Sequence, residues 1–242
     1  MDERTHPHDV DAAPAEPRLT RRRSLLGFGG LVAGGLAAAG WEALAPPGGG
    51  PAGVASGAVS CVLAPEQTEG PFYIPNERVR RDITEGKPGA PLDLSLSVVD
   101  ASSCRPVRNA SVDIWHADAS GAYSGFGAGS GNRTFLRGVQ RTDARGVARF
   151  TTIYPGWYPG RAVHIHVKVH VAGDVVHTGQ LYFSDALTDA VFKRSPYSRR
   201  GARQVRNPDD AIYRNGGKRS TLAVRRSGSR YLGSITMGVQ LA

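Results

Sequence analysis

Three histidines lie close together in the stretch R-A-V-H-I-H-V-K-V-H-V, residues 161–171. His164 and His166 are two residues apart, so in an extended strand both side chains point to one face, with Cα atoms roughly 6.6 Å apart. Two imidazoles at this spacing can bind one metal ion, with bonds of about 2 Å each. His170 is roughly 13 Å from His166, too far for the same ion. We therefore expect His170, like His177, to be an ordinary exposed residue.

The histidine pair alone leaves the metal open, because zinc hydrolases, oxygenases and plain solvent-facing strands all carry such pairs. Nearby tyrosines narrow the choice: Tyr154 and Tyr158 precede the strand, and Tyr123 lies in a G-A-Y-S turn. A phenol has a pKa of about 10, so only a strongly polarising cation keeps it ionised at neutral pH. Ferric iron does this well and zinc less readily, and two phenolates balance the ferric charge. These residue types favour ferric iron.

The strand that carries the histidines has two chemically different faces. One set of alternate positions is apolar and consists of Val163, Ile165, Val167, Val169 and Val171. The other set consists of Ala162, His164, His166, Lys168 and His170, and it is polar apart from Ala162. Because side chains alternate across a strand, the apolar set predicts a face in a hydrophobic core and the histidines lie on the opposite face.

Alternating apolar and polar residues predict further short strands over 92–98, 112–116 and 147–151, separated by turn sequences rich in Gly, Asp and Pro. We therefore expect an all-β fold, an antiparallel β-sandwich with long loops. Residues 125–138 contain many Gly, Ser and Asn residues and predict a surface loop. Residues 186–193 predict one short helix.

The N-terminal residues resemble an export signal rather than part of the fold. T-R-R-R-S-L-L at residues 20–26 places an arginine pair before a Gly- and Ala-rich run that is too short for a membrane anchor. We expect a twin-arginine signal over residues 1–45, periplasmic or extracellular export, and no stable membrane span after cleavage. Residues 46–60 then form a flexible linker, and 61–242 form the domain.

Two cysteines, Cys61 and Cys104, both follow the signal, so they lie in a compartment that permits disulfides. We expect them to pair, which would stabilise the fold by about 4 kcal/mol on the loop-closure model. Two free thiols are the alternative.

The net charge of +9 is concentrated near the C-terminus, where residues 193–230 hold twelve Lys or Arg against Asp209 and Asp210. These basic residues are scattered among Gly, Ser, Pro and Asn, and no aromatic platform for base stacking is interleaved with them. The pattern favours a solvated face, or one that attracts anionic aromatic acids, over nucleic-acid binding.

Several motifs together resemble the intradiol ring-cleavage dioxygenases, the class of protocatechuate 3,4-dioxygenase and catechol 1,2-dioxygenase. They occur in order, from residue 68 to residue 183, as T-E-G-P-F-Y, V-D-I-W-H-A-D, G-A-Y, T-D, I-Y-P-G-W-Y-P, R-A-V-H-I-H and G-Q-L-Y-F. The resemblance is strongest over residues 110–183, and the motifs in this order are highly specific.

The resemblance implies that Tyr123, Tyr158, His164 and His166 hold Fe(III), with Arg161 and Gln180 beside them and Tyr158 leaving the metal when substrate binds. Tyr154 and Tyr182 match no ligand, and we expect them in the core or on strand faces. The implied reaction cleaves an aromatic 1,2-diol between its hydroxylated carbons with O2, giving a muconate-type diacid. Family members associate, but no interface pattern is visible, so homo-oligomerisation stays open.

Three departures from the family pattern concern the pocket and the setting of the enzyme. Only five residues separate Tyr158 from His164, fewer than in the protocatechuate enzymes, and this segment would form a wall of the substrate pocket. The helical region that precedes the core of the catechol enzymes is replaced here by a signal and a linker. Export is also unusual for an enzyme of aromatic catabolism. The main alternative function is a non-catalytic, prealbumin-like β-sandwich binding module, which would not need Tyr158, Arg161 and the histidine pair together.

Overall fold

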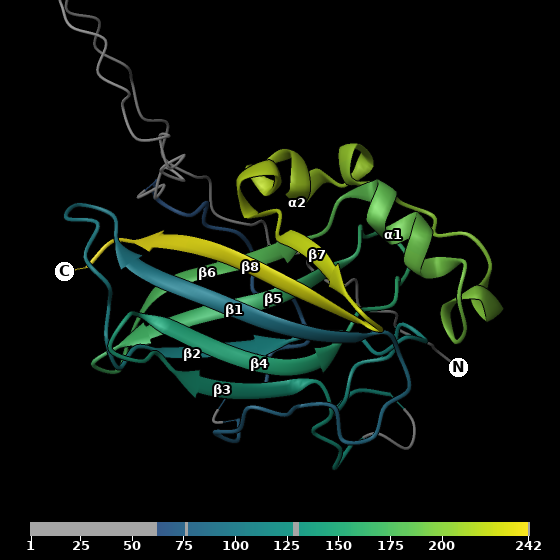
Figure 1. The fold of residues 1–242 in the computed structure, drawn as a ribbon, viewed down its shortest axis with the longest axis horizontal. Helices are drawn as coiled ribbons and strands as arrows, with labels where there is room; N and C mark the ends of the chain where they lie inside the picture. The colour runs from purple at the N-terminus through teal and green to yellow at the C-terminus, as the bar shows by residue number, and fades with distance from the viewer. Residues whose placement is uncertain (1–61, 76, 128–130, 242) are drawn as a thin grey trace, which may run out of the picture. The chain divides into compact units, whose positions relative to one another are not determined.

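The computed structural model describes residues 62–75, 77–127 and 131–241 (Figure 1). In these ranges two four-stranded sheets pack face to face, with strand orders β4-β1-β8-β7 and β3-β2-β5-β6. The strands are β1 (Pro91–Asp100), β2 (Ser111–Trp115), β3 (Arg137–Arg141), β4 (Val147–Ile153), β5 (His164–Val171), β6 (Asp174–Tyr182), β7 (Ala223–Ser227) and β8 (Arg230–Val239). The predicted all-β sandwich is confirmed.

One strand pair differs from the antiparallel expectation. β8 runs parallel to β1, with Leu92 opposite Tyr231 and Asp100 opposite Val239, whereas the other pairs between these described strands are antiparallel. Alternation along a strand shows which face is buried but contains no information about the direction of its partner, so the sequence could not predict this pairing.

The core lies between the sheets and is built from the alternate apolar residues that the strand pattern predicts. Leu92, Leu94 and Leu96 of β1 belong to the same buried cluster as Ile165 and Val167 of β5. Burying side chains of this size stabilises the fold by about 1.5–3 kcal/mol each.

The second face of β5 is also buried, because the segment that precedes β1 crosses over it. Lys168 forms an ion pair with Glu69, and its ammonium lies 3.9 Å from the centre of the Tyr73 ring. At the neighbouring strand β6, the Gln67 amide donates to the Thr178 carbonyl at 2.9 Å. His164, His166 and Lys168 are therefore buried although they face away from the core.

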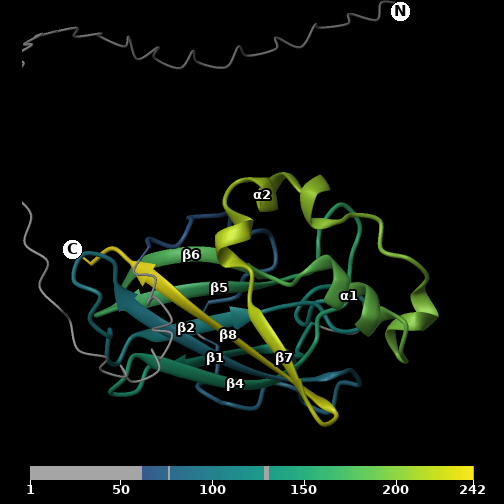
Figure 2. The ribbon, with the colours of Figure 1, turned by 45° about the horizontal axis from the view of Figure 1, so that its top comes forward.

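Helices lie at the end of the sandwich where β6 finishes (Figures 1 and 2). The helix α1 (Asp185–Phe192) confirms the predicted one within a residue at each end, and the Ser184 hydroxyl caps it by accepting from the Leu187 amide at 3.3 Å. The other short elements are α2 (Ala211–Arg214) and the 3-10 turns η1 (Tyr197–Arg200), η2 (Asn207–Asp209) and η3 (Gly217–Ser220). None of these four was predicted.

The region predicted as a loop over residues 125–138 contains the beginning of β3. Leu136 is fully buried and lies just before β3, the strand that pairs with β2. Arg137, the first residue of β3, is 1% exposed. The Gly and Ser residues therefore mark the first part of this region, whereas its end is ordered by packing against Ile83, whose carbonyl accepts from the Leu136 amide at 2.7 Å.

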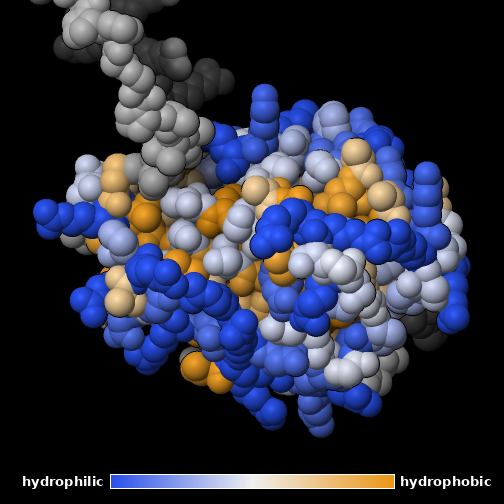
Figure 3. Space-filling model, viewed as in Figure 1, coloured by the Kyte–Doolittle hydropathy of each residue, from blue (hydrophilic) through white to orange (hydrophobic). Residues whose placement is uncertain are grey.

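The basic C-terminal segment is partly neutralised by acids from other elements. Arg203 and Arg206 pair with Asp185 and Asp189 of α1, and Arg230 pairs with Asp93 at 2.7 Å. Figure 3 shows hydrophilic residues over much of the face seen in Figure 1, interrupted by apolar patches. Three of the twelve basic residues of this segment thus form local ion pairs, and the other nine make no ion pair with an acidic side chain in the described residues.

The predicted signal and linker, residues 1–60, lie outside the described residues, as does Cys61, so the signal and the Cys61–Cys104 disulfide stay predictions. In the described ranges, no helix has both the length and the apolar composition needed to cross a bilayer.

Candidate metal centre and active site

Four side chains converge on one point outside β5. The His164 and His166 Nε2 atoms are 3.1 Å apart, and the Tyr158 Oη atom is 3.0 Å from His164 Nε2. The Tyr123 ring centre is 5.6 Å from that of Tyr158 and 6.1 Å from that of His166. The structure thus brings together all four residues named as metal ligands, although they come from β5 and from two separate loops.

His164 is oriented by a hydrogen bond to the backbone. Its Nδ1 donates to the Ala162 carbonyl at 2.7 Å, so the lone pair is on Nε2, the atom that faces His166 and Tyr158. Burial, with a smaller effect from Arg161, lowers the pKa of His164 to about 3. A neutral imidazole with its lone pair aimed into the site is the form that binds a metal.

His166 is held by packing instead. Its ring stacks on Trp115 at 4.9 Å between centres and 5° between planes, the two residues being paired across β2 and β5. On Gly70, a Cβ atom would lie 3.1 Å from His166 Cε1, so the glycine lets the backbone approach the ring closely. His166 Nδ1 is buried and has no hydrogen-bond partner among the described residues. Burial, then His164, lowers the pKa of His166 well below its usual value.

Tyr123 is presented by a tight turn after β2. The Asp118 carboxylate accepts from the Ser120 amide at 2.8 Å and the Ala122 amide at 3.0 Å. Gly121 has φ +85°, and a Cβ there would lie 2.3 Å from the Trp157 carbonyl oxygen, so this turn requires glycine.

The Tyr123 hydroxyl is buried and has no hydrogen-bond partner in the described part of the chain. Burial, followed by the nearby Tyr158, raises the pKa of Tyr123 well above 10, while Arg161 and Arg137 act in the opposite direction. A buried polar group without a partner costs about 1–3 kcal/mol. A cation bound at this point would satisfy the oxygen and keep it ionised, so the donor set fits a metal ion.

A metal ion at this point would need tyrosine ligands. Among the described residues, no group of three or more His, Cys, Asp or Glu side chains gathers where it could hold a metal ion. Two imidazole nitrogens and two phenol oxygens are therefore the available donors at this point. Such a set suits a hard, highly charged cation better than zinc.

Arg161 and Gln180 lie together beside the four donors. The Arg161 Nη2 donates to Gln180 Oε1, and its Nε donates to Asp210 Oδ2 at 2.9 Å. Gln180 is fully buried and its Nε2 donates to the Thr68 carbonyl at 3.0 Å. Burial raises the pKa of Tyr158 and the positive charge of Arg161 lowers it, which indicates that the guanidinium is close to this hydroxyl.

Sequence reasoning missed Arg137, which supports the Tyr123 loop from behind. Its Nη1 donates to the Phe72 carbonyl at 2.6 Å and its Nε donates to the Ser124 hydroxyl at 2.9 Å. Phe72 in turn stacks on the Tyr123 ring at 4.3 Å. One buried guanidinium therefore fixes both the residue after Tyr123 and the ring stacked on it. The residue gave no sequence signal because it lay in the predicted loop.

The other histidines and tyrosines are outside the site. His170 is half-buried at the far end of β5. The expectation that His177 is exposed was wrong: it is 3% exposed and contacts Glu66 at 2.7 Å, because the segment before β1 packs over β6. Tyr154 and Tyr182 are both fully buried, which confirms their assignment to the core and strand faces.

Known proteins resemble this chain in sequence and in fold. A family model described as Dioxygenase matches residues 68–204, which include every donor named above. An intradiol ring-cleavage dioxygenase from Tetranychus urticae is 34% identical, with a TM-score of 0.69, and the match covers 74% of this chain and 95% of that one. The chain belongs to the intradiol ring-cleavage dioxygenase family.

Other dioxygenases match over different lengths. The dioxygenase domain of a dioxygenase and carbohydrate-binding protein fusion from Streptomyces sp. SirexAA-E is 32% identical, covers 75% of this chain and all of that domain, and has a TM-score of 0.59. Catechol 1,2-dioxygenase 1 of Acinetobacter lwoffii is 33% identical over 100 residues, which is 39% of this chain and 32% of that protein. The matched part therefore spans about a third of that curated relative.

His116 lies next to the Tyr123 turn, and its burial should make the stability of the fold depend on pH. It is buried between the Ala117 carbonyl and the Thr152 hydroxyl, both at 2.8 Å, and burial lowers its pKa from 6.5 to about 4. Between these values the unfolded chain binds a proton that the folded protein does not, so the free energy of unfolding decreases as the pH falls from about 6.5 to 4.

We expect His116→Gln, which keeps a donor and an acceptor but cannot titrate, to reduce the pH dependence of this free energy by about 1.4 kcal/mol per pH unit at most, the value for one proton. Urea unfolding of metal-free protein between pH 4.5 and 7 measures it. Equal slopes for the wild type and the variant would contradict the assignment.

Proposed function

We propose that this protein is a non-haem Fe(III) dioxygenase that cleaves an aromatic 1,2-diol between its hydroxylated carbons and places both atoms of O2 in a muconate-type diacid. The observation that carries the proposal is the convergence of two facing imidazole nitrogens, the Tyr158 hydroxyl and the buried, unpartnered Tyr123 hydroxyl on one point. Membership in the intradiol family supports the choice of reaction.

The proposed iron ligands are Tyr123, Tyr158, His164 and His166. When bound, ferric iron supplies a Lewis acid that polarises the oxygens of the diol and activates its ring. The protein supplies neutral imidazoles, because burial suppresses their protonation, and two oxygens that ionise against the metal charge.

Tyr158 is the ligand best suited to leave the metal and accept a substrate proton. Its side chain is half-buried, whereas Tyr123, His164 and His166 are at most 4% exposed. Its Oη atom also lies near Arg161, which favours the phenolate form. We assign to Tyr158 Oη the role of a base toward one diol hydroxyl, since proton transfer requires this combination of access and tuned pKa.

Arg161 is proposed to stabilise the negative charge that builds on the diol ring during the reaction. Its guanidinium is held on two sides by Asp210 and Gln180, so it needs no reorganisation when that charge appears. Neighbouring aromatic rings, including Phe72 and Phe126, pack around Tyr123 and Tyr158. They provide a water-poor, low-dielectric wall against an aromatic substrate, which strengthens the effect of the charge.

The iron assignment predicts a coloured protein. After loading with iron under air, the protein should be red-brown from phenolate-to-iron charge transfer, and Tyr123→Phe and His164→Ala should each lose the bound iron and the colour. His170→Ala is the matched control on the same strand and should keep both. Visible absorption and iron content per chain are the measurements. A wild type that stays colourless after loading would contradict the assignment and favour a zinc site or the non-catalytic module.

The reaction assignment predicts oxygen uptake with aromatic diols. On a panel of catechol, protocatechuate and hydroxyquinol, the iron-loaded protein should consume one O2 per diol and release a ring-opened diacid. Arg161→Lys should lower kcat about 10²–10³-fold, since it removes a preorganised charge contact. Arg225→Lys, at an exposed position of β7, is the control. The proposal fails if oxygen uptake matches the iron-free blank on every diol.

We propose export through the twin-arginine route, on the evidence of the arginine pair and the A-L-A sequence ahead of the domain. Action outside the cytoplasm on phenolic compounds derived from lignin is then the proposed setting. Fractionation of the cells that produce the full chain should find the mature protein outside the cytosol, and Arg21→Lys with Arg22→Lys should retain it inside. Mature protein found in the cytosol alone would contradict this route.

A further inference from the structure

Asp210 is a buried carboxylate at the edge of the site, although the sequence places it in the basic C-terminal segment. It is 1% exposed, and both of its oxygens are hydrogen-bonded. Oδ1 accepts from the Ile212 amide at 2.8 Å and the Tyr213 amide at 3.0 Å, which caps α2. Oδ2 accepts from Arg161 Nε at 2.9 Å and the Ala162 amide at 2.7 Å.

The second oxygen connects Asp210 to two groups of the site at once. Arg161 is held directly, by a charge-assisted hydrogen bond of the strong class. His164 is reached through Ala162, whose amide donates to Asp210 and whose carbonyl accepts from His164 Nδ1 at 2.7 Å. A shift of the carboxylate would therefore move both the guanidinium and the backbone that orients an imidazole.

The charge of Asp210 is retained despite its burial. Burial alone raises the pKa of this carboxyl, but the Ala162 and Tyr213 amides and the Arg161 guanidinium outweigh that effect and lower it below its usual value. The carboxylate therefore stays ionised beside Arg161 and balances its charge.

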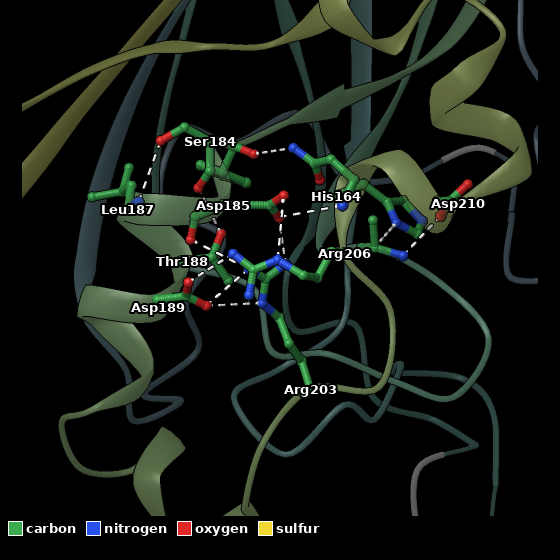
Figure 4. A network of polar contacts seen from close by, with 12 residues as sticks. His164, Ser184, Asp185, Leu187, Thr188, Asp189, Arg203, Arg206 and Asp210 are labelled. Atoms are coloured by element: carbon green, nitrogen blue, oxygen red, sulfur yellow. Dashed lines mark hydrogen bonds and ion pairs between the residues drawn. The ribbon is translucent and has the colours of Figure 1, made fainter.

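The segment that carries Asp210 is anchored to α1. Arg203 and Arg206 bind Asp185 and Asp189, as Figure 4 shows with Asp210 and His164 on the other side of the network. Asn207 extends the anchor, since its side chain donates to the Phe183 carbonyl at 2.8 Å. Asp210 thus has a fixed support three residues away.

We propose that Asp210 is a positioning residue of the reaction, which holds Arg161 against the substrate site and orients His164 through Ala162. This inference rests on the proposed function. The competing explanation is that Asp210 only caps α2. The two explanations differ, because a cap alone would affect stability but not turnover, iron binding or the state of His164.

Two neutral variants separate these explanations. Asn and Ser are both good helix N-caps, so Asp210→Asn and Asp210→Ser can each keep a cap while removing the carboxylate. An Asn side chain has one acceptor oxygen, whereas the carboxylate has two. If that oxygen caps α2, the Asn NH2 group faces the donors of Arg161 and Ala162, so the contact with Arg161 is lost. Ser serves if the Asn variant does not fold. Asp209→Asn is the matched control, since Asp209 is the exposed neighbour in the same segment.

The experiment compares the full-length wild type with the three variants in iron-loaded and metal-free form. We expect the two Asp210 variants to lower kcat about 10–100-fold, to shift the charge-transfer band and to release iron faster to a chelator. In metal-free protein with ¹⁵N-labelled histidine, His164 should show a protonated Nδ1 in the wild type and Asp209→Asn, and should lose that state in the Asp210 variants.

Each outcome is decisive for one of the two proposals. Asp210 variants that melt at a lower temperature but keep the wild-type kcat, iron release and His164 nitrogen signals would overturn the positioning role. A wild type that neither binds iron nor consumes oxygen would overturn the proposed function instead, and the nitrogen signals of the metal-free protein would still test whether Asp210 orients His164.

Discussion

Strand β5 buries two faces of opposite chemistry, one apolar and one polar, and the candidate site is formed by the burial of the polar face. Its apolar face packs into the sandwich core, while the segment before β1 and the Tyr123 loop cover the face that carries His164 and His166. Burial removes water from these imidazoles and from the Tyr123 phenol, so all three stay neutral without a metal. The same desolvation makes a bound cation the natural partner for their lone pairs.

Two arginines flank the donors, and each is balanced by a carboxylate. Arg137 lies behind the Tyr123 loop, 3.9 Å from Glu77, and Arg161 is bonded to Asp210. Both guanidiniums favour ionised phenols, and both act as mechanical supports because each bonds to more than one backbone or side-chain group. Since each positive charge has its own counter-charge, the two tyrosines would be free to neutralise the charge of the proposed metal ion.

The sequence predicted the parts of the site that depend on short-range pattern. The period-two alternation placed His164 and His166 on one face, because this feature needs only a strand. Tyr123 and Tyr158 lie in loops, and the family resemblance, not local pattern, named them as candidate ligands. Arg137 and Asp210 escaped detection because their roles arise from contacts far along the chain, inside segments that looked like a flexible loop and a solvated basic stretch. The prediction that His177 is exposed was wrong for the same reason, because its burial by residues 66–67 cannot be inferred from the sequence of β6 alone.

The central place of the last strand has a consequence for how the chain is made. β8 lies between β1 and β7 in its sheet. It pairs with β1, although the two strands, residues 91–100 and 230–239, are far apart in the sequence. The sheet that contains β1 therefore cannot close until β8 has been synthesised, and such distant pairings slow folding. A chain cut before residue 230 would lack an inner strand of this sheet rather than an edge, so the sandwich can form only after β8 has been synthesised.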